Sequence, residues 1–206
     1  MTTQMTFDLP LDHTWELTAD RPISRDEFIW FCQKNPELRC ELTADGKIIV
    51  MAPLTFDSGL YEHEISSELR SFVKAQKKGI ALGSSVGFTL PDGSVRAPDA
   101  AWISDEQLAG LSQAERQTFA HLVPEFVIEV RSKSDTMASL RRKMQESWIG
   151  NGVLLAWLID PENRASFVFF PGGRVEGPVP FTEVLTADPV LPGFTLLLDE
   201  LIKANI

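Results

Sequence analysis

The sequence has few of the residues that disulfide-rich, thiolate-metal or membrane proteins need. Its 206 residues include two cysteines, Cys32 and Cys40, with no metal-ligand spacing around them. Two isolated cysteines fit a reducing compartment better than a disulfide framework. No apolar run approaches the length that crosses a bilayer, and the N-terminus has neither the basic nor the apolar region of a signal peptide. We therefore expect a cytoplasmic protein that makes no use of a membrane.

Several catalytic signatures are absent as well. The three histidines, His13, His63 and His121, show no pairing in the sequence. There is no phosphate-binding glycine loop, no nucleophile elbow and no zinc-type cluster of cysteine and histidine. These absences turn attention to the acidic residues.

Basic residues are also scarce relative to acidic ones. The chain has 19 Lys and Arg against 29 Asp and Glu, a formal net charge of −10 and a pI near 4.8. Broad, charge-driven binding of nucleic acid needs many Lys and Arg contacts to phosphates, and this balance argues against it. A local basic groove or a metal-bridged phosphate remains compatible with the composition.

The apolar content predicts a folded domain. Hydrophobic residues make up 44% of the chain and charged residues 23%, which is ordinary for a globular protein. This length is enough to bury a substantial core in one unit. We expect an N-terminal arm over residues 1–20, without sustained periodicity, and a single domain over 21–206.

Local signals predict alternating helices and strands. Ser24 and Glu27 form a capping box, and Asp45-Gly46 between two apolar segments is typical of a hairpin turn. The expected helices lie at about 24–34, 58–77 and 135–149, with two short ones near 104–107 and 112–115; the expected strands lie at about 40–42, 47–51, 84–90, 97–103, 126–130, 154–159 and 166–170. This order predicts a mixed α/β fold, with a central sheet flanked by helices and parallel strands at 126–130 and 154–159.

Two carboxylates stand inside apolar segments. Asp99 leads into Ala100-Ala101-Trp102-Ile103, and Glu129 interrupts the apolar run 126–130. A carboxylate in a buried strand is costly unless it is paired or bound to a metal. On neighbouring strands, with both side chains on one face, these two acids could share one divalent cation. Taken singly, Asp99 also fits a turn-capping residue after proline, and Glu129 a strand-end acid paired with a surface arginine.

Five segments, in order over about 150 residues, resemble the Uma-two family of restriction-endonuclease-like proteins, which belongs with the PD-(D/E)XK nuclease superfamily. They are residues 41–53, 88–101, 129–135, 158–163 and 191–194. The resemblance implies a restriction-endonuclease-like mixed sheet, here with an extra N-terminal helix and β-hairpin. It implies an endonuclease that uses Mg²⁺ or Mn²⁺ to hydrolyse phosphodiester bonds, with DNA as the expected substrate and RNA not excluded.

Carried onto this chain, the resemblance implies a set of metal ligands. Asp99 and Glu129 match the acidic positions, with the Val130 carbonyl as a third ligand and Glu41 as a possible further one. Hard oxygen ligands of this kind suit Mg²⁺ or Mn²⁺. Glu41 fits a plain hairpin-edge residue at least as well.

The basic residues depart from the simplest superfamily pattern. Arg131 takes the slot of the usual lysine, and a guanidinium cannot carry a proton near neutral pH, so we expect Arg131 to contact a substrate phosphate. The resemblance places the lysine function on the following helix, at Lys143. A snorkelling flank residue is nearly as good a description of Lys143, and Arg131 could be a plain surface charge.

A second interpretation is that the chain has the nuclease fold but not the nuclease activity. The acidic balance favours a catalytically inactive nuclease-fold protein that acts as an interaction or nucleic-acid-binding module. Relatives carry a histidine early in the helix near residue 58, where this chain has Ser58 or Gly59. The resemblance also suggests a homodimer, because many such nucleases pair to cut two strands.

Overall fold

The computed structural model describes residues 15–203. Its helices are α1 (Arg25–Lys34), α2 (Phe56–Gln76), α3 (Asp105–Gly110), α4 (Met137–Arg142) and α5 (Leu198–Lys203). Its strands are β1 (Trp15–Leu17), β2 (Arg39–Leu42), β3 (Ile48–Met51), β4 (Ile80–Gly83), β5 (Phe88–Thr89), β6 (Val95–Arg96), β7 (Ala100–Ile103), β8 (Ala120–His121), β9 (Phe126–Val130), β10 (Leu155–Asp160), β11 (Ala165–Phe169), β12 (Val175–Pro180), β13 (Leu185–Thr186) and β14 (Thr195–Leu196). No helix in this part of the chain is long and apolar enough to span a membrane.

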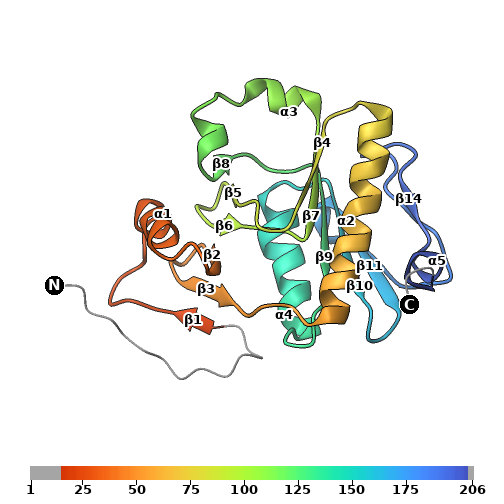
Figure 1. The fold of residues 1–206 in the computed structure, drawn as a ribbon, viewed down its shortest axis with the longest axis horizontal. Coiled ribbons are helices and arrows are strands. Elements are labelled where there is room, and N and C mark those ends of the chain that lie inside the picture. The colour runs from red at the N-terminus through yellow and green to blue at the C-terminus, as the bar shows by residue number, and fades with distance from the viewer. Residues whose placement is uncertain (1–14, 204–206) are drawn as a thin grey trace.

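The described strands form two six-stranded sheets and one two-stranded pair. The central sheet has the order β12-β11-β10-β9-β7-β4, and the N-terminal sheet the order β1-β3-β2-β6-β5-β8 (Figure 1). In the central sheet β9 and β10 are parallel and the other pairings are antiparallel, so the expected mixed sheet with parallel strands at 126–130 and 155–160 is confirmed.

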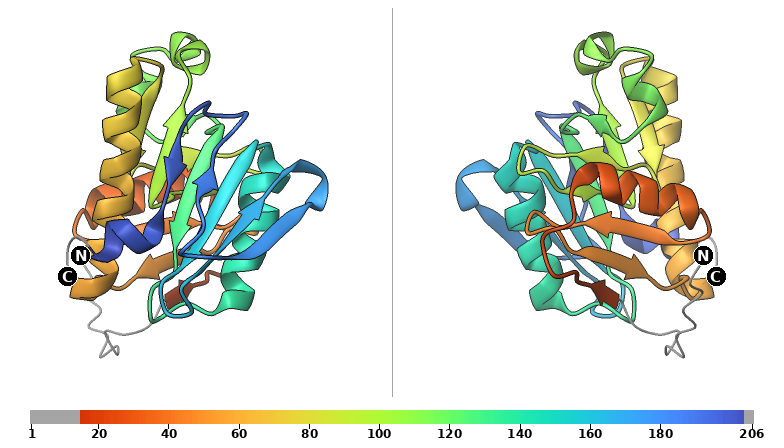
Figure 2. Two further views of the ribbon diagram at one scale, coloured as in Figure 1. Left: turned by 90° about the vertical axis from the view of Figure 1, so that its right-hand side faces the viewer. Right: turned by 90° about the vertical axis from the view of Figure 1, so that its left-hand side faces the viewer.

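Helices cover both faces of the central sheet. Figure 2 shows α2 on one side of the strands and α4 on the other. Because side chains alternate along a strand, Phe126 and Ile128 of β9 pack in the core under α2, whereas Val127 packs in the core under α4. The same alternation places Glu129 on the α4 side. The third core lies between α1 and the N-terminal sheet, around Phe28.

The helix that follows β9 is not regular. After α4 the chain forms a π-helical turn, η2 (Lys143–Trp148), in which the N–H of Ile149 reaches the carbonyl of Met144. A 3₁₀ turn, η3 (Ile149–Asn151), then leads to Gly152, which closes the segment in the left-handed region. Single π-turns inside helices often lie at functional sites. Here the turn carries Lys143 at its start and Trp148 at its end.

Most of the expected elements are confirmed, with some corrections. The strands expected at 84–90 and 97–103 are shorter: they are β5 and β7, and residues 97–99 cross between the sheets. β6, just before this crossing, closes a hairpin with β5, whereas β7 belongs to the other sheet. β4 and β12 were not expected, and β12 pairs beyond β11. Within the expected arm, Trp15–Leu17 form β1 against β3, and residues 1–14 lie outside the described part.

Candidate active site

The chain crosses from the N-terminal sheet to the central sheet at residues 97–99, and Asp99 ends this crossing. β7 pairs with β9 so that Ala100 lies opposite Ile128, and the next step of the same register places Asp99 opposite Glu129. The Oδ2 atom of Asp99 accepts a hydrogen bond from the Val130 N–H at 2.7 Å. The two acids therefore lie side by side on neighbouring strands, as the sequence predicts.

Glu129 is held by two donors from the irregular helix. Its side chain is 6% exposed, and its Oε1 atom lies 2.8 Å from Lys143 Nζ. The indole Nε1–H of Trp148 donates to the same oxygen at 2.7 Å. Both donors belong to η2, so the π-turn fixes the position of this carboxylate.

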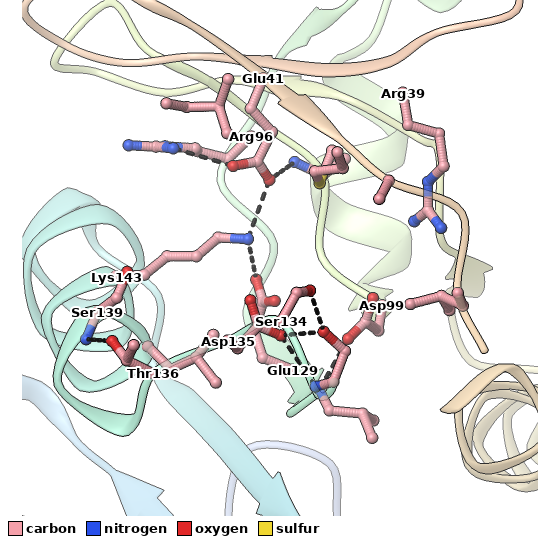
Figure 3. A pocket seen from close by; sticks show the side chains of 18 of the residues that line it. Arg39, Glu41, Arg96, Asp99, Glu129, Ser134, Asp135, Thr136, Ser139 and Lys143 are labelled. Atoms are coloured by element: carbon pink, nitrogen blue, oxygen red, sulfur yellow. Dashed lines mark hydrogen bonds and ion pairs between the residues drawn. The ribbon is translucent and has the colours of Figure 1, made fainter. Parts of the chain in front are cut away.

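Glu41 of β2 completes the polar cluster from the N-terminal sheet. Its Oε1 atom accepts hydrogen bonds from Lys143 Nζ and from the Ala97 N–H, both at 3.0 Å. Its Oε2 atom accepts from Arg96 at 2.9 Å. Lys143 thus bridges Glu41 and Glu129, as Figure 3 shows. We call Glu41, Asp99, Glu129 and Lys143 the acid–lysine cluster.

The cluster lines a cavity of about 890 Å³. The walls come from β2, β6 and β9, from the start of α2, and from α4 with η2. Ser58, at the start of α2, also lines this cavity and is buried. The cavity is therefore built where the two sheets and the helices on both faces of the central sheet meet.

The two neighbouring carboxylates resist ionisation. Burial, followed by the charges of Glu129 and Glu62, raises the pKa of Asp99 well above its usual value. Burial also raises the pKa of Glu129, and Glu41 adds to this rise while Lys143 opposes it. A cation placed between Asp99 and Glu129 would favour the ionised form of each carboxyl group and so lower both pKa values.

Lys143, unlike the two acids, is held in its charged form. Burial alone would lower its pKa, but the charges of Glu129 and Glu41 outweigh burial and raise the pKa of Lys143 above its usual value. Burial would raise the pKa of the Glu41 carboxyl group, but the charges of Lys143 and Arg96 hold this pKa below its usual range. Lys143 is therefore a permanent cation here and cannot serve as a general base near neutral pH.

The donor set fits a divalent cation of the hard, oxygen-preferring kind. Within residues 15–203, no three carboxylate, histidine or cysteine side chains lie close enough to hold a metal ion. Mg²⁺ is ordinarily bound by only one or two carboxylates, with waters and substrate phosphates filling the other positions. Asp99 and Glu129 can supply these two carboxylates. Both oxygens of Glu41 are already occupied by donors, so Glu41 serves to hold Lys143 and Arg96.

Arg131 does not join the site residues. It is not part of the cavity wall, and its guanidinium contacts Asp160 at 3.1 Å and Glu162 at 2.8 Å. Although burial raises it, hydrogen bonds from Asn163 and Arg131 keep the pKa of Asp160 below its usual value. We call Arg131, Asp160 and Glu162 the strand-end cluster. The expected phosphate contact of Arg131 therefore has no support in the geometry, because its donors face carboxylates outside the cavity.

Sequence reasoning missed three contributors to the site. Arg96 stands in the Arg-Ala-Pro-Asp segment, and its proximity to Asp99 was the available signal. Trp148 reads as an ordinary apolar residue of a helix face, and only the π-turn reveals that it faces Glu129. Glu62 of α2 acts on Asp99 through space, and no local pattern could have indicated that.

Comparisons with known proteins give a family and a fold for the chain. A family model named Uma2 and described as "Putative restriction endonuclease" matches residues 25–199. The chain is also similar to a crystal structure described as a putative nuclease belonging to DUF820 from Anabaena variabilis ATCC 29413, with a TM-score of 0.71 and 22% identity over 88% of this chain and 98% of that one. At this identity the likeness establishes the fold. No curated protein matches the chain.

Proposed function

Because the chain belongs to the Uma2 family of putative restriction endonucleases, we propose that it is a metal-dependent endonuclease that hydrolyses DNA phosphodiester bonds. One observation carries the proposal. Asp99, Glu129 and Lys143, which lie far apart in the sequence, converge on one cavity, and the two acids face each other across paired strands. Ionisable groups with strongly perturbed pKa values in a cleft are the usual mark of a catalytic centre.

In this proposal the acidic and the basic residues have different roles. Asp99 and Glu129 would hold Mg²⁺ or Mn²⁺, with the Val130 carbonyl as a further oxygen ligand. When bound, such a cation polarises a non-bridging phosphate oxygen and lowers the pKa of an attacking water. Lys143 keeps its proton and stabilises the negative charge that develops on the phosphate.

Two residues keep the reactive groups in place. Glu41 accepts from Lys143 at 3.0 Å and so fixes the ammonium group over Glu129. Trp148 donates to Glu129 at 2.7 Å and limits the rotation of that carboxylate. Groups whose rotamers are fixed in this way lose little entropy when the substrate binds, which favours catalysis by positioning.

The direct test is a cleavage assay on supercoiled plasmid and on single-stranded DNA, with Mg²⁺ or Mn²⁺. We expect the wild-type chain to cut and Asp99→Ala to cut on the order of 10³-fold more slowly, as loss of an essential member of a catalytic group does. Glu68→Ala is the matched control, because it removes an exposed carboxylate of α2 outside the cavity wall. RNA in parallel reactions decides between the two nucleic acids.

Absence of cutting on every substrate would favour the alternative, a nuclease-fold protein without activity that binds a partner or nucleic acid. The serine at position 58 of the cavity wall favours this alternative, because the family resemblance implies a histidine early in this helix. Cutting of both strands would also call for a homodimer, which sedimentation of the chain with and without DNA would detect.

A further inference from the structure

The cavity wall differs in charge from the rest of the molecule. The whole chain has 29 acidic and 19 basic residues, but the cavity wall is close to balanced. Its basic members are Arg39, Arg96, Lys133, Arg142 and Lys143, and its acidic members are Glu16, Glu41, Asp99, Glu129, Asp135 and Glu146. The cavity wall is therefore less acidic than the chain as a whole.

The basic residues of the wall differ in how their charges are compensated. Arg96 and Lys143 are committed to Glu41 and Glu129. In the described part of the chain, the side chains of Lys133, Arg142 and Arg39 make no ion pair or hydrogen bond. Lys133 and Arg142 are exposed, so water can solvate them.

Arg39 is the exception, because it is half-buried and its Nε atom has no solvent contact and no hydrogen-bond partner. A donor left in this state costs free energy, since it has lost water without gaining an acceptor. The Nε of Arg96 shares this feature, but the Arg96 guanidinium is bound to Glu41. Arg39 therefore has a donor for which its surroundings supply no acceptor.

The position of Arg39 indicates what acceptor would suit this donor. Arg39 and Glu41 are two residues apart on β2, so both side chains lie on the cavity face of the strand. Figure 3 shows Arg39 reaching into the cavity from the Asp99 side, while Lys143 enters from the other side. An anion that contacts both Arg39 and Lys143 must therefore extend across the cavity.

We propose that Arg39 binds a phosphate of the nucleic-acid backbone next to the phosphate that is cut. This inference rests on the proposed function and names the residue that takes over the role expected of Arg131. A guanidinium presents parallel N–H donors that match two phosphate oxygens, and such a pair is stronger than a neutral hydrogen bond. Arg39 then governs affinity for the strand, and Lys143 governs the rate of bond cleavage.

The experiment measures binding and cleavage separately for Arg39→Met and Arg39→Lys. Binding is followed by fluorescence anisotropy with a labelled DNA duplex of roughly two helical turns, in Ca²⁺ and over a range of salt. The control is Arg70→Met, which removes an exposed arginine of α2 outside the cavity wall. Melting temperatures check that each variant is folded.

We expect Arg39→Met to weaken binding by about ten- to a hundredfold, the value of a hydrogen bond to a charged group. The slope of log K against log salt should fall by about one, since one phosphate contact is lost. Arg39→Lys should keep most of the slope but not the affinity, because lysine has the charge without the paired donors. Single-turnover rates at saturating DNA should change little, and Arg70→Met should resemble the wild type.

The outcomes separate this inference from the proposed function. Arg39-dependent binding without cleavage by any variant would support the phosphate contact and overturn the nuclease. Cleavage and salt dependence unchanged in Arg39→Met would overturn the phosphate contact and leave the nuclease standing. A wild-type chain that neither binds nor cuts DNA would overturn both. A lower melting temperature of Arg39→Met with unchanged binding would show a structural role and also overturn the inference.

Discussion

Two charged clusters at the end of strand β9 differ in how their charges are balanced. In the strand-end cluster, Arg131 meets Asp160 at 3.1 Å and Glu162 at 2.8 Å, and the pKa of Asp160 stays low. In the acid–lysine cluster, Asp99 and Glu129 lie together and both pKa values are raised. The charges of the first cluster compensate one another, whereas the second cluster has an excess of buried negative charge.

This difference separates structural charges from functional ones. Both clusters combine at least one buried acid with a base, and both include a residue of the same Glu-Val-Arg segment of the sequence. A compensated ion pair holds a turn in place. An excess of buried negative charge costs stability, so its presence in a fold points to a functional role. Four experiments test this difference between the two clusters.

The largest effect is expected at Lys143. Lys143→Met keeps the length of the side chain and removes the charge that stabilises the phosphate. We expect single-turnover cleavage to slow by about 10²–10³-fold, the usual loss for one electrostatic stabiliser. Lys133→Met is the control, because Lys133 lines the same cavity but is exposed and outside the acid–lysine cluster. Equal rates in the two variants would remove Lys143 from the mechanism.

The second experiment adds a divalent cation, Mn²⁺, to the folded chain. At about 100 to 1,000 times its Kd, Mn²⁺ should raise the free energy of unfolding by roughly 2–4 kcal/mol, because it binds the folded chain alone. The Asp99→Asn, Glu129→Gln double variant should show no such gain. Thermal melts with Mn²⁺ or with EDTA measure this. An identical rise in the double variant would place the cation elsewhere.

The third experiment tests the strand-end cluster. Arg131→Met should lower the free energy of unfolding by about 1–3 kcal/mol, because it leaves the buried Asp160 without its cation. Since the pKa of Asp160 is lowered by folding, its stabilising contribution is present above the pKa of the unfolded chain and is lost as the pH falls. The loss caused by Arg131→Met should therefore shrink in acid.

Cleavage by Arg131→Met, measured below its melting temperature, should stay near that of the wild type. A strong loss of DNA affinity in this variant, with stability unchanged, would return the phosphate contact to Arg131 and reverse the comparison. Urea unfolding at several pH values, together with the binding assay, decides between the two.

The smallest effect concerns pH in the absence of metal. Folding raises the pKa of Asp99, so its favourable contribution is complete below the pKa of the unfolded chain and is lost as the pH rises through the folded value. In EDTA, Asp99→Asn should therefore melt a few degrees above the wild type near pH 8, and the difference should narrow toward pH 4. A difference that does not depend on pH would mean that Asp99 is already compensated.

Much of the fold was predictable because its signals are local. The capping box of Ser24 and Glu27, the Asp45-Gly46 turn and the apolar run of β9 each specify their own structure. The membership of β6 and β7 in different sheets was not predictable, because it depends on which distant strands pair with each of them. β4 was missed for the same reason: it is short, ends in glycine and gains its place by pairing with β7.

The candidate site was also predictable only in part. Asp99 and Glu129 were predictable because acids in apolar strands are costly, and Lys143 followed from the family resemblance. The partner of Arg131 was not predictable, because Asp160 lies 29 residues away and is brought near by the parallel pairing of β9 and β10. Arg39 gave no signal at all, because an unpartnered donor can be recognised only in three dimensions.

The π-turn η2 has a consequence for how this protein can change over evolution. Lys143 and Trp148 are five residues apart, and in a regular α-helix of 3.6 residues per turn they would point about 140° apart. The wider turn aligns them on one oxygen of Glu129. Their convergence thus depends on the wide turn, which fits a spacing of five residues. Substitutions at 144–147 that keep this turn should leave the convergence intact. Deletion of one residue there should restore a regular helix in which the two donors are four residues and about 40° apart, so they should still share one face.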